Sequence, residues 1–302
     1  MTLDFDHAKV AFVDTCLSDD KQEVVLNLPI KSIDSSNLPC VSIVVVTKNR
    51  KHFSDIFINN WKRIQYPPEK LELVVVDDSD DIKEGPILEL KSLKDPRISY
   101  YYINPEHNKN YQEELKTLLK SQNASDINDF TKFRTIGYKR NYGVKVSKHD
   151  FVCMLDDDDY LYDESILARV VSLLSYKKGC VYSDSIAIYN TKFESSYVNL
   201  YSDSICEGSM LFTKDFWKVN KFSEDINIKS EGIQLVKGRE LEVVKIPWMF
   251  NLIALSGKHN YNGRTKRILK KKTQSIENYN LYKTFPETFK IVIKKLNKSQ
   301  IF

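Results

Sequence analysis

Four consecutive aspartates at positions 156–159 directly follow a run of apolar residues at 151–155. The apolar run predicts a buried strand, so the carboxylates stand where that strand ends. Like charges gathered at such a place repel one another and resist desolvation unless a cation neutralises them. Alternate residues of an extended chain point to the same side, so we expect Asp156 and Asp158 to converge on one hard metal ion, Mg²⁺ or Mn²⁺. A solvated acidic turn is the alternative interpretation.

Short apolar segments alternate with helical patterns through the first half of the chain. The expected strands are 41–47, 71–76, 98–103 and 151–155, and the expected helices are 53–63, 87–93 and 136–146. This alternation predicts an α/β fold with a parallel sheet flanked by helices. Ligands of such open sheets bind beyond the carboxyl ends of the strands. Asp77 and Asp78 follow the second strand, so we expect them on the same edge as the acidic run.

The remaining segments are less regular. Residues 104–132 are polar and rich in Asn and Lys, and we interpret them as an insertion or a mobile loop with a helix near 111–119. Further on, we expect a helix at 165–174, one or two strands at 180–190, a strand at 208–213 before a short helix at 215–219, and strands at 243–246 and 250–255.

A length of 302 residues permits one large domain with appendages. We expect a lead-in or accessory segment at 1–38, a main domain at 39–263 and a helical basic tail at 264–302. The tail holds eleven Lys and Arg against two Glu, whereas the whole chain has a formal charge of +4, so the rest is acidic. The dense run 264–272 could contact an anionic surface, although such a run is more often a solvated helix face. A nucleic-acid partner is not expected.

Cellular location is constrained by what the sequence lacks. No apolar stretch approaches the roughly 18 residues that a membrane span needs, and the first residues have no signal-peptide pattern. The five cysteines are odd in number and form no Cys-x-x-Cys pair, which argues against a disulfide framework or a zinc site. We therefore expect a soluble protein of the cytoplasm.

The order of the motifs resembles a known family. The matching stretches are 41–50, 71–79, 135–143, 155–160 and 230–239, with His259 closing the set. In this order they resemble the GT-A fold glycosyltransferases of the family-2-like group, and most closely those encoded by large DNA viruses. The resemblance covers about residues 40–265. It implies a GT-A type, Rossmann-like sheet and transfer of a sugar from a nucleotide-sugar donor, expected to be a UDP-sugar, to a hydroxyl group of a glycan or glycoprotein.

The resemblance also implies a donor site. In that family, acidic residues after the second strand hold the base and ribose of the donor. A carboxylate can accept hydrogen bonds from N–H groups of the base or O–H groups of the ribose. The helix at 136–146 adds groups that contact the nucleotide or order the acidic loop. The residues that match these positions are Thr47, Asp77, Asp78, Lys139, Arg140, Asn141, Asp156 and Asp157. Without the resemblance, a turn cluster at 77–81 and surface charge on the helix are the alternatives.

The resemblance places a divalent ion, Mn²⁺ or Mg²⁺, at the acidic run. The ion would neutralise the nucleoside diphosphate as it leaves. Asp158 matches the main metal ligand and Asp156 a ligand of ribose or metal. Asp157 takes the variable position, and Asp159 would lie behind the ligands. His259 matches a position that helps to hold metal or diphosphate.

The acceptor hydroxyl needs a base, which the family commonly supplies from a Glu-Asp pair. Here residues 230–232 are Ser-Glu-Gly, so the second acid is missing. Glu231 is therefore the candidate catalytic base, with Asp225 in reserve, and in-line attack would invert the anomeric configuration. Trp248 and the next two residues, Met249 and Phe250, would form an acceptor-side wall or belong to the core.

Other interpretations stay open from sequence. A haloacid-dehalogenase-type phosphotransferase also places Asp-x-Asp after a strand, but normally has Thr or Val where this chain has Asp159 and Tyr160. The order of acids does not fit a receiver-like signalling domain. A non-catalytic nucleotide-sugar or glycan-binding protein on the same fold is the third alternative, and the Gly232 departure favours it.

Overall fold

The computed structural model describes residues 2–3, 10–13, 23–26, 33–191, 194–200, 204–228, 230–248, 251–256 and 285–298. His259, Met249, Phe250 and the basic run 264–272 lie outside these residues. Two small antiparallel pairs precede the main domain: β1 (Thr2–Leu3) with β4 (Ile33–Asp34), and β2 (Val10–Val13) with β3 (Glu23–Leu26).

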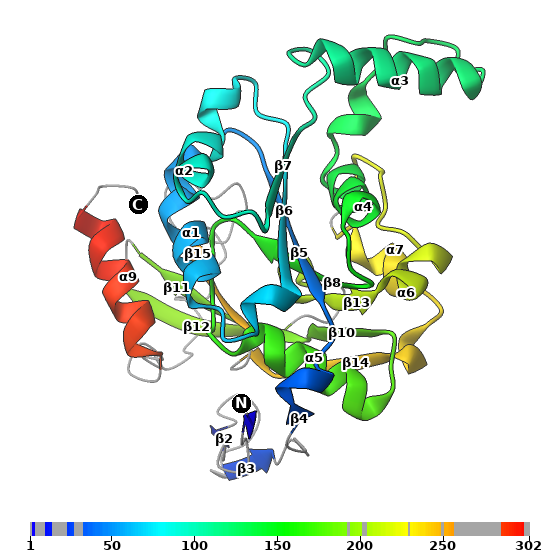
Figure 1. Ribbon diagram of the computed structural model, residues 1–302. Helices are drawn as coiled ribbons and strands as arrows, with labels where there is room; N and C mark the ends of the chain where they lie inside the picture. The colour runs from blue at the N-terminus through cyan, green and yellow to red at the C-terminus, as the bar shows by residue number, and fades with distance from the viewer. Residues whose placement is uncertain are drawn as a thin grey trace, which may run out of the picture.

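A seven-stranded sheet forms the centre of the molecule (Figure 1). Its order is β14-β10-β13-β8-β5-β6-β7, and all neighbours are parallel except those of β13, which is antiparallel to both β10 and β8. The strands span Val41–Thr47 (β5), Leu71–Asp77 (β6), Ile98–Tyr102 (β7), Phe151–Asp156 (β8), Cys180–Ser183 (β10), Leu211–Thr213 (β13) and Val243–Ile246 (β14). β5, β6 and most of β8 are buried, which explains their nearly continuous apolar sequences.

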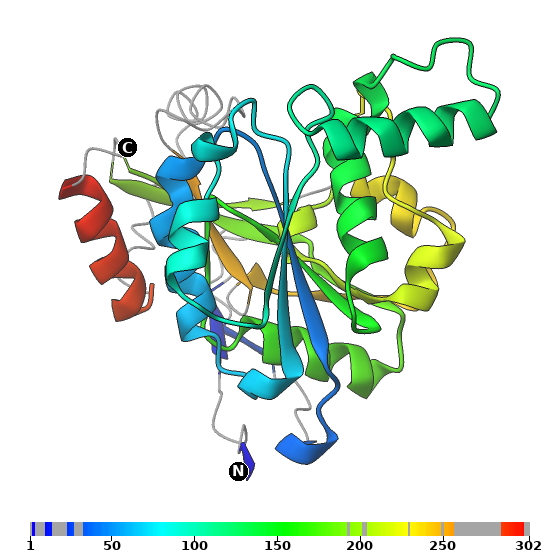
Figure 2. The same ribbon diagram turned by 45° about the horizontal axis from the view of Figure 1, so that its top comes forward.

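Helices cover both faces of this sheet (Figures 1 and 2). Alternate residues of β5 belong to two separate hydrophobic cores, one on each face of the sheet. Ile43 packs with α1 and α5, and Val44 packs with α3, α4 and α6. The helices span Ser54–Arg63 (α1), Ile87–Ser92 (α2), Lys109–Ser121 (α3), Ile136–Val146 (α4), Ser165–Tyr176 (α5), Lys214–Val219 (α6) and Gly232–Val236 (α7).

Helix α4 sits unusually close to the sheet. The side chain of Thr135 caps its first turn by accepting a hydrogen bond from the backbone N–H of Tyr138. About two turns beyond this cap, a Cβ at Gly143 would lie 2.3 Å from Cγ1 of Val44 on β5, so only glycine fits. The close contact fixes where the polar residues of α4 stand relative to the end of β5.

A second sheet of four strands packs beside the first, in the order β12-β11-β15-β9. Its strands are Asp159–Leu161 (β9), Ser185–Asn190 (β11), Ser195–Leu200 (β12) and Leu252–Ser256 (β15). The C-terminal helix α9 (Glu287–Lys298) lies against this sheet (Figure 1). Phe289 of α9 is fully buried among Tyr160, Tyr189 and Trp248. Trp248 is thus a core residue, which is the second of the two interpretations left open by the sequence.

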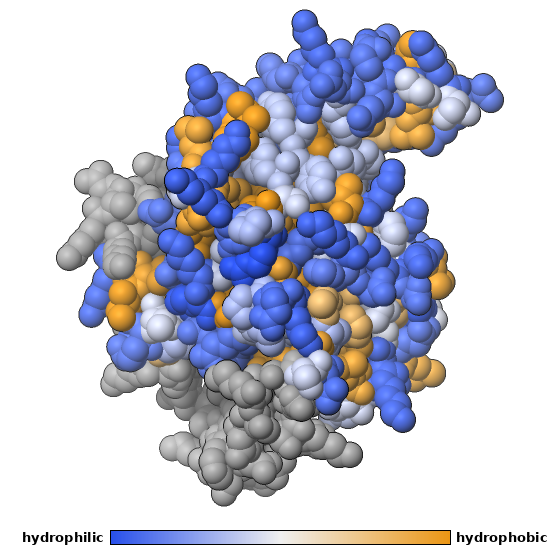
Figure 3. Space-filling model, in the orientation of Figure 1, coloured by the Kyte–Doolittle hydropathy of each residue, from blue (hydrophilic) through white to orange (hydrophobic). Residues whose placement is uncertain are grey.

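Helix α3 stands out from the body as an arm with a mostly hydrophilic surface (Figure 3). It occupies much of the segment 104–132 that we expected to be an insertion or a mobile loop, and it is longer than the helix expected at 111–119. Its buried residues Tyr111, Leu115 and Leu119 explain its attachment to the core. None of the helices in the described part of the chain is both long and apolar enough to cross a membrane.

Candidate active site at the carboxyl edge of the sheet

The predicted clustering of acidic residues at one sheet edge is confirmed by the strand register. Thr47 at the end of β5 pairs with Asp77 of β6, and Val46 pairs with Asp156 of β8. The three strands therefore end together, and the residues that follow them share one rim. This rim is the candidate functional site.

The two aspartates that follow β6 have different surroundings. Asp77 accepts hydrogen bonds from the backbone N–H and the hydroxyl of Ser79, and a third from the hydroxyl of Tyr100. Burial raises the pKa of Asp77, which these hydrogen bonds partly offset. Gly85 packs directly against Asp77, since a Cβ atom at position 85 would collide with the Asp77 carboxylate. Asp77 thus orders the loop after β6 in the ligand-free protein, and its predicted contact with the donor stays a prediction.

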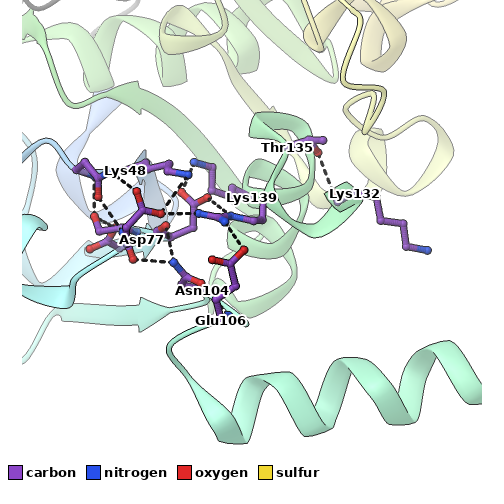
Figure 4. Close-up of polar contacts among 12 residues, drawn as sticks. Lys48, Asp77, Asn104, Glu106, Lys132, Thr135 and Lys139 are labelled. Carbon is purple, nitrogen blue, oxygen red and sulfur yellow. Dashed lines mark hydrogen bonds and ion pairs between the residues drawn. The ribbon is translucent and has the colours of Figure 1, made fainter. Parts of the chain in front are cut away.

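Asp78 forms a buried ion pair with the helix behind it. Nζ of Lys139 on α4 lies 2.6 Å from Oδ1 of Asp78, and both side chains are almost wholly buried. Nε of Arg134 lies 3.7 Å from the other carboxylate oxygen. Asn104 donates to the backbone carbonyl groups of Asp78 and Ser79. Figure 4 shows Lys139, Asp77 and Asn104 converging here from α4, β6 and the segment after β7.

The acidic run 156–159 forms a turn between the two sheets. Asp156 ends β8, Asp157 and Asp158 make the turn, and Asp159 begins β9. The expectation that Asp156 and Asp158 lie on one side of an extended strand was therefore wrong, because the chain reverses between them. Asp159 is fully buried, and its carbonyl oxygen accepts a hydrogen bond from Asn60.

One hydroxyl group and one guanidinium group stabilise the turn. Oγ1 of Thr47 donates to Oδ2 of Asp157 at 2.6 Å. The guanidinium of Arg50 lies 3.2 Å from Asp157 and 2.5 Å from Asp158. Burial raises the pKa of Asp157 despite the opposing charge of Arg50. The carboxylates are thus compensated by protein groups even without a ligand.

Arg140 connects the acidic run to the candidate base. Its Nη2 lies 2.8 Å from Asp156 and its Nε lies 2.7 Å from Oε1 of Glu231. Glu207 lies close to Glu231: it accepts hydrogen bonds from the hydroxyl of Ser230 and the N–H of Gly232. Burial and the negative charge of Glu231 raise the pKa of Glu207 to about 7. This part of the rim therefore contains two neighbouring glutamates with one arginine between them and the acidic run.

Asn141, the third predicted residue of α4, faces a different part of the protein. Its amide nitrogen donates to the carbonyl of Phe222 and to Glu224, and its oxygen accepts from Trp217 and from the N–H of Phe222. These four hydrogen bonds use the full capacity of an amide side chain. Asn141 thus fixes the segment 217–224 to α4, and this geometry leaves no hydrogen bond for a nucleotide.

A cavity of about 1050 Å³ adjoins the rim. Its walls come from the start of α4 and the turn before it, from α3 and the following loop, and from the segment before α7. The charged residues that line it include Lys48, Arg134, Asp225 and Glu231. Asp225 is exposed, whereas Glu231 is mostly buried by its contact with Arg140. The cavity is large enough for a sugar or a short peptide segment.

Sequence reasoning missed three charged residues of this site: Arg50, Arg134 and Glu207. The position of Arg50, three residues beyond the end of a buried strand, was a usable indication. No sequence pattern indicated that Glu207 belongs to the site. Its position at the rim depends on the pairing of β13, the strand that follows it, with β8.

Suitability for a divalent ion rests on the acidic turn. Among the described residues no group of three or more His, Cys, Asp or Glu side chains surrounds a single point. Mg²⁺ and similar ions are, however, commonly held by one or two carboxylates together with substrate phosphates and water. Asp156 and Asp158 supply oxygen ligands of that kind, so the site suits such an ion in chemistry but leaves most of its ligands to a donor. His259 lies outside the described residues.

The mostly parallel, helix-flanked sheet has the GT-A fold of its structural neighbours, which agrees with the fold that the resemblance predicted. No protein-family model and no curated protein matches the sequence. Among solved structures, S. aureus TarS 1–349 in complex with UDP-GlcNAc has a TM-score of 0.51 and 13% identity, over 73% of this chain and 60% of that chain. The mannosyltransferase PcManGT from Pyrobaculum calidifontis, in complex with GDP-Man and Mn²⁺, has a TM-score of 0.50 and 13% identity, over 86% of this chain and 70% of that chain. The chain therefore spans about 60% of the length of TarS 1–349.

Proposed function

We propose that the protein is a metal-dependent, inverting glycosyltransferase that moves a sugar from a UDP-sugar to a hydroxyl group of a glycan or glycoprotein. The observation that supports this most is the arrangement along one rim of a GT-A fold. A buried acid–base pair, an acidic turn and a glutamate-lined cavity follow one another there. They match the three parts of the reaction: nucleoside, diphosphate and acceptor.

In this proposal the nucleoside lies against the ends of β5 and β6. The Asp78 carboxylate, fixed by Lys139, accepts hydrogen bonds from the base or ribose. Arg134 and Lys48 close the pocket from the cavity side. The complexes of the structural neighbours support a nucleotide donor, since they contain UDP-GlcNAc and GDP-Man.

The diphosphate lies next to the acidic turn. Asp158, with Asp156, would hold Mn²⁺ or Mg²⁺ there, and a bound divalent ion acts as a Lewis acid on the leaving diphosphate. Arg140 keeps Asp156 in place from behind. The presence of Mn²⁺ in the complex of the mannosyltransferase neighbour supports this choice of cofactor.

The acceptor enters the cavity, and Glu231 takes the proton of its hydroxyl group. As that proton moves to the carboxylate, the acceptor oxygen bonds to the anomeric carbon and the bond from this carbon to the diphosphate breaks. Attack opposite the leaving group inverts the configuration. Asp225 also lines the cavity but is remote from the Arg140 contacts, so it remains the reserve base.

A binding protein without turnover is the second candidate, and one observation favours it. Oε1 of Glu231 is engaged by Arg140 at 2.7 Å, and a glycine follows where the family commonly has a second acid. A carboxylate held by a guanidinium is a weaker base than a free one. Measuring turnover separates the two candidates.

The deciding experiment is a panel of nucleotide sugars with Mn²⁺ and candidate acceptors, in which release of the nucleoside diphosphate is measured. We expect release from one donor, its loss in Asp158→Asn, and loss of transfer with retained UDP binding in Glu231→Gln. Asp225→Asn is the matched control and should remain active. Binding of UDP without release in any reaction would favour the binding protein. If no nucleotide binds, the proposal fails.

A further inference from the structure

Arg50 occupies the carboxylates to which a divalent ion would bind. Its Nη2 lies 2.5 Å from Oδ2 of Asp158, and its Nε lies 3.2 Å from Oδ1 of Asp157. One guanidinium thus bridges both residues of the acidic turn. An arginine and a divalent ion on the same carboxylate repel each other, and the shared oxygen can serve only one of them.

The attachment of Arg50 to the rest of the protein is light. Its side chain is 27% exposed, and its guanidinium stacks on the ring of Phe53 at 4.6 Å. Arg140 differs in this respect, because its side chain is only 4% exposed and is held between Asp156 and Glu231. Of these two arginines, Arg50 is the one that can leave its carboxylates without unpacking a core.

The charge of the acidic turn explains why such a counterion is present. Asp157 and Asp158 are nearly buried, and Asp156 adjoins them. Carboxylates that close together need a positive charge nearby to remain ionised. Arg50 supplies this charge, and a donor diphosphate would offer Arg50 a new partner of the bidentate kind that guanidinium groups prefer.

We infer that Arg50 is a resident counterion of the acidic turn, which a divalent ion must displace from Asp158 in order to bind. The inference rests on the proposed function. It makes the ion bind weakly to the empty protein and more tightly once a diphosphate has drawn Arg50 away. Binding of the nucleotide and of the ion is then mutually favourable, because each releases the contact that hinders the other.

The test is Mn²⁺ binding to the nucleotide-free protein, measured by calorimetry and by the electron paramagnetic resonance signal of free Mn²⁺. Because the competing guanidinium is gone, Arg50→Gln should bind Mn²⁺ at least tenfold more tightly than the wild type. Lys51→Gln is the matched control: it removes the same charge from the next residue of the chain, but Lys51 pairs with Glu89. Its Mn²⁺ affinity should stay within about twofold of the wild type. Arg50→Lys retains a charge and should resemble the wild type.

An unchanged or weaker Mn²⁺ affinity in Arg50→Gln would overturn the inference, and so would an equal gain in Lys51→Gln. UDP binding, measured on the same samples, reports correct folding and keeps the two proposals apart. If UDP binds but Arg50→Gln gains no Mn²⁺ affinity, the counterion role is wrong and the glycosyltransferase proposal stands. If neither protein binds UDP, the proposed function has failed.

Discussion

The hydroxyl of Thr47 donates a 2.6 Å hydrogen bond to Asp157 and thereby joins the end of β5 to the acidic turn. Thr47→Val keeps the shape of the side chain but leaves the buried carboxylate without this donor. We expect it to lose about 1–3 kcal/mol of unfolding free energy. Urea denaturation measures the loss. Thr47→Ser retains the hydroxyl and should lose less, so equal midpoints for the two variants would contradict the assigned role.

The buried pair of Asp78 and Lys139 gives a second prediction. Lys139→Met leaves the Asp78 carboxylate buried without its nearest cation, which should cost about 3–5 kcal/mol. Adding Asp78→Asn removes the stranded charge, so the double variant should be more stable than the sum of the two single effects predicts. A double-mutant cycle by chemical denaturation measures this coupling. Strict additivity would show that the two residues do not stabilise each other.

Glu207 gives a prediction about pH. Its pKa is raised from an ordinary 4.5 to about 7, so the folded protein holds a proton that the unfolded chain has lost between these values. Its contribution to stability is therefore complete below about pH 4.5 and is lost as the pH rises through about 7. Glu207→Gln keeps an acceptor for Ser230 and Gly232 but carries no charge. We expect this variant to melt higher than the wild type at pH 8, with a difference that shrinks towards pH 5. If the difference in melting temperature stayed constant from pH 5 to pH 8, it would not arise from ionisation of Glu207.

The packing of α9 gives a fourth prediction. Phe289 is fully buried against the second sheet, so Phe289→Ala should cost about 3–5 kcal/mol. Ile291 on the same helix is 52% exposed, and Ile291→Ala should change stability by less than about 0.5 kcal/mol. Thermal unfolding monitored by circular dichroism compares the two. Similar melting temperatures would mean that α9 does not stabilise the second sheet.

The central strands could be predicted from the sequence because they are buried on both faces. Residues 41–47 form β5 with the expected bounds, and the strand expected at 71–76 extends by one residue to Asp77. Their continuous apolar sequences, and the acidic residues that follow them, were sufficient to predict where these strands lie in the sequence. The same pattern placed Asp77 and Asp156 on one edge, which the strand register confirms.

Other elements depend on contacts that a local pattern does not contain. β9 starts inside the acidic run, where four aspartates indicate a turn, and it forms because Asp159 pairs with Ala254 of β15. β12 has a largely polar sequence and exists through its pairing with β11. The interpretation of 104–132 as an insertion or a mobile loop included a helix near 111–119, but the sequence did not indicate that Tyr111, Leu115 and Leu119 attach α3 to the core.

Among the site residues too, local sequence patterns predicted some positions, whereas others depend on contacts between distant segments. The acids that follow strands and the cations of one regular helix were named as candidates, among them Asp78 and Lys139, whereas Arg50 was missed. Their partners were harder to see, because ion pairs between distant segments leave no pattern in the sequence. The link from Arg140 to Glu231 spans 91 positions of the chain. The predicted main domain 39–263 and tail 264–302 stay predictions, although α9 of the tail packs on the second sheet.

The contact of Gly143 with Val44 has a mechanical consequence. Because a methyl group does not fit between them, α4 has no room to slide or roll over β5 unless the backbone of the sheet moves with it. Lys139 and Arg140 are carried by that helix, so they belong to one rigid unit with β5 and β6. Any closure around a ligand must then hinge elsewhere, in the loop that carries Arg50 or in the turn that precedes α4.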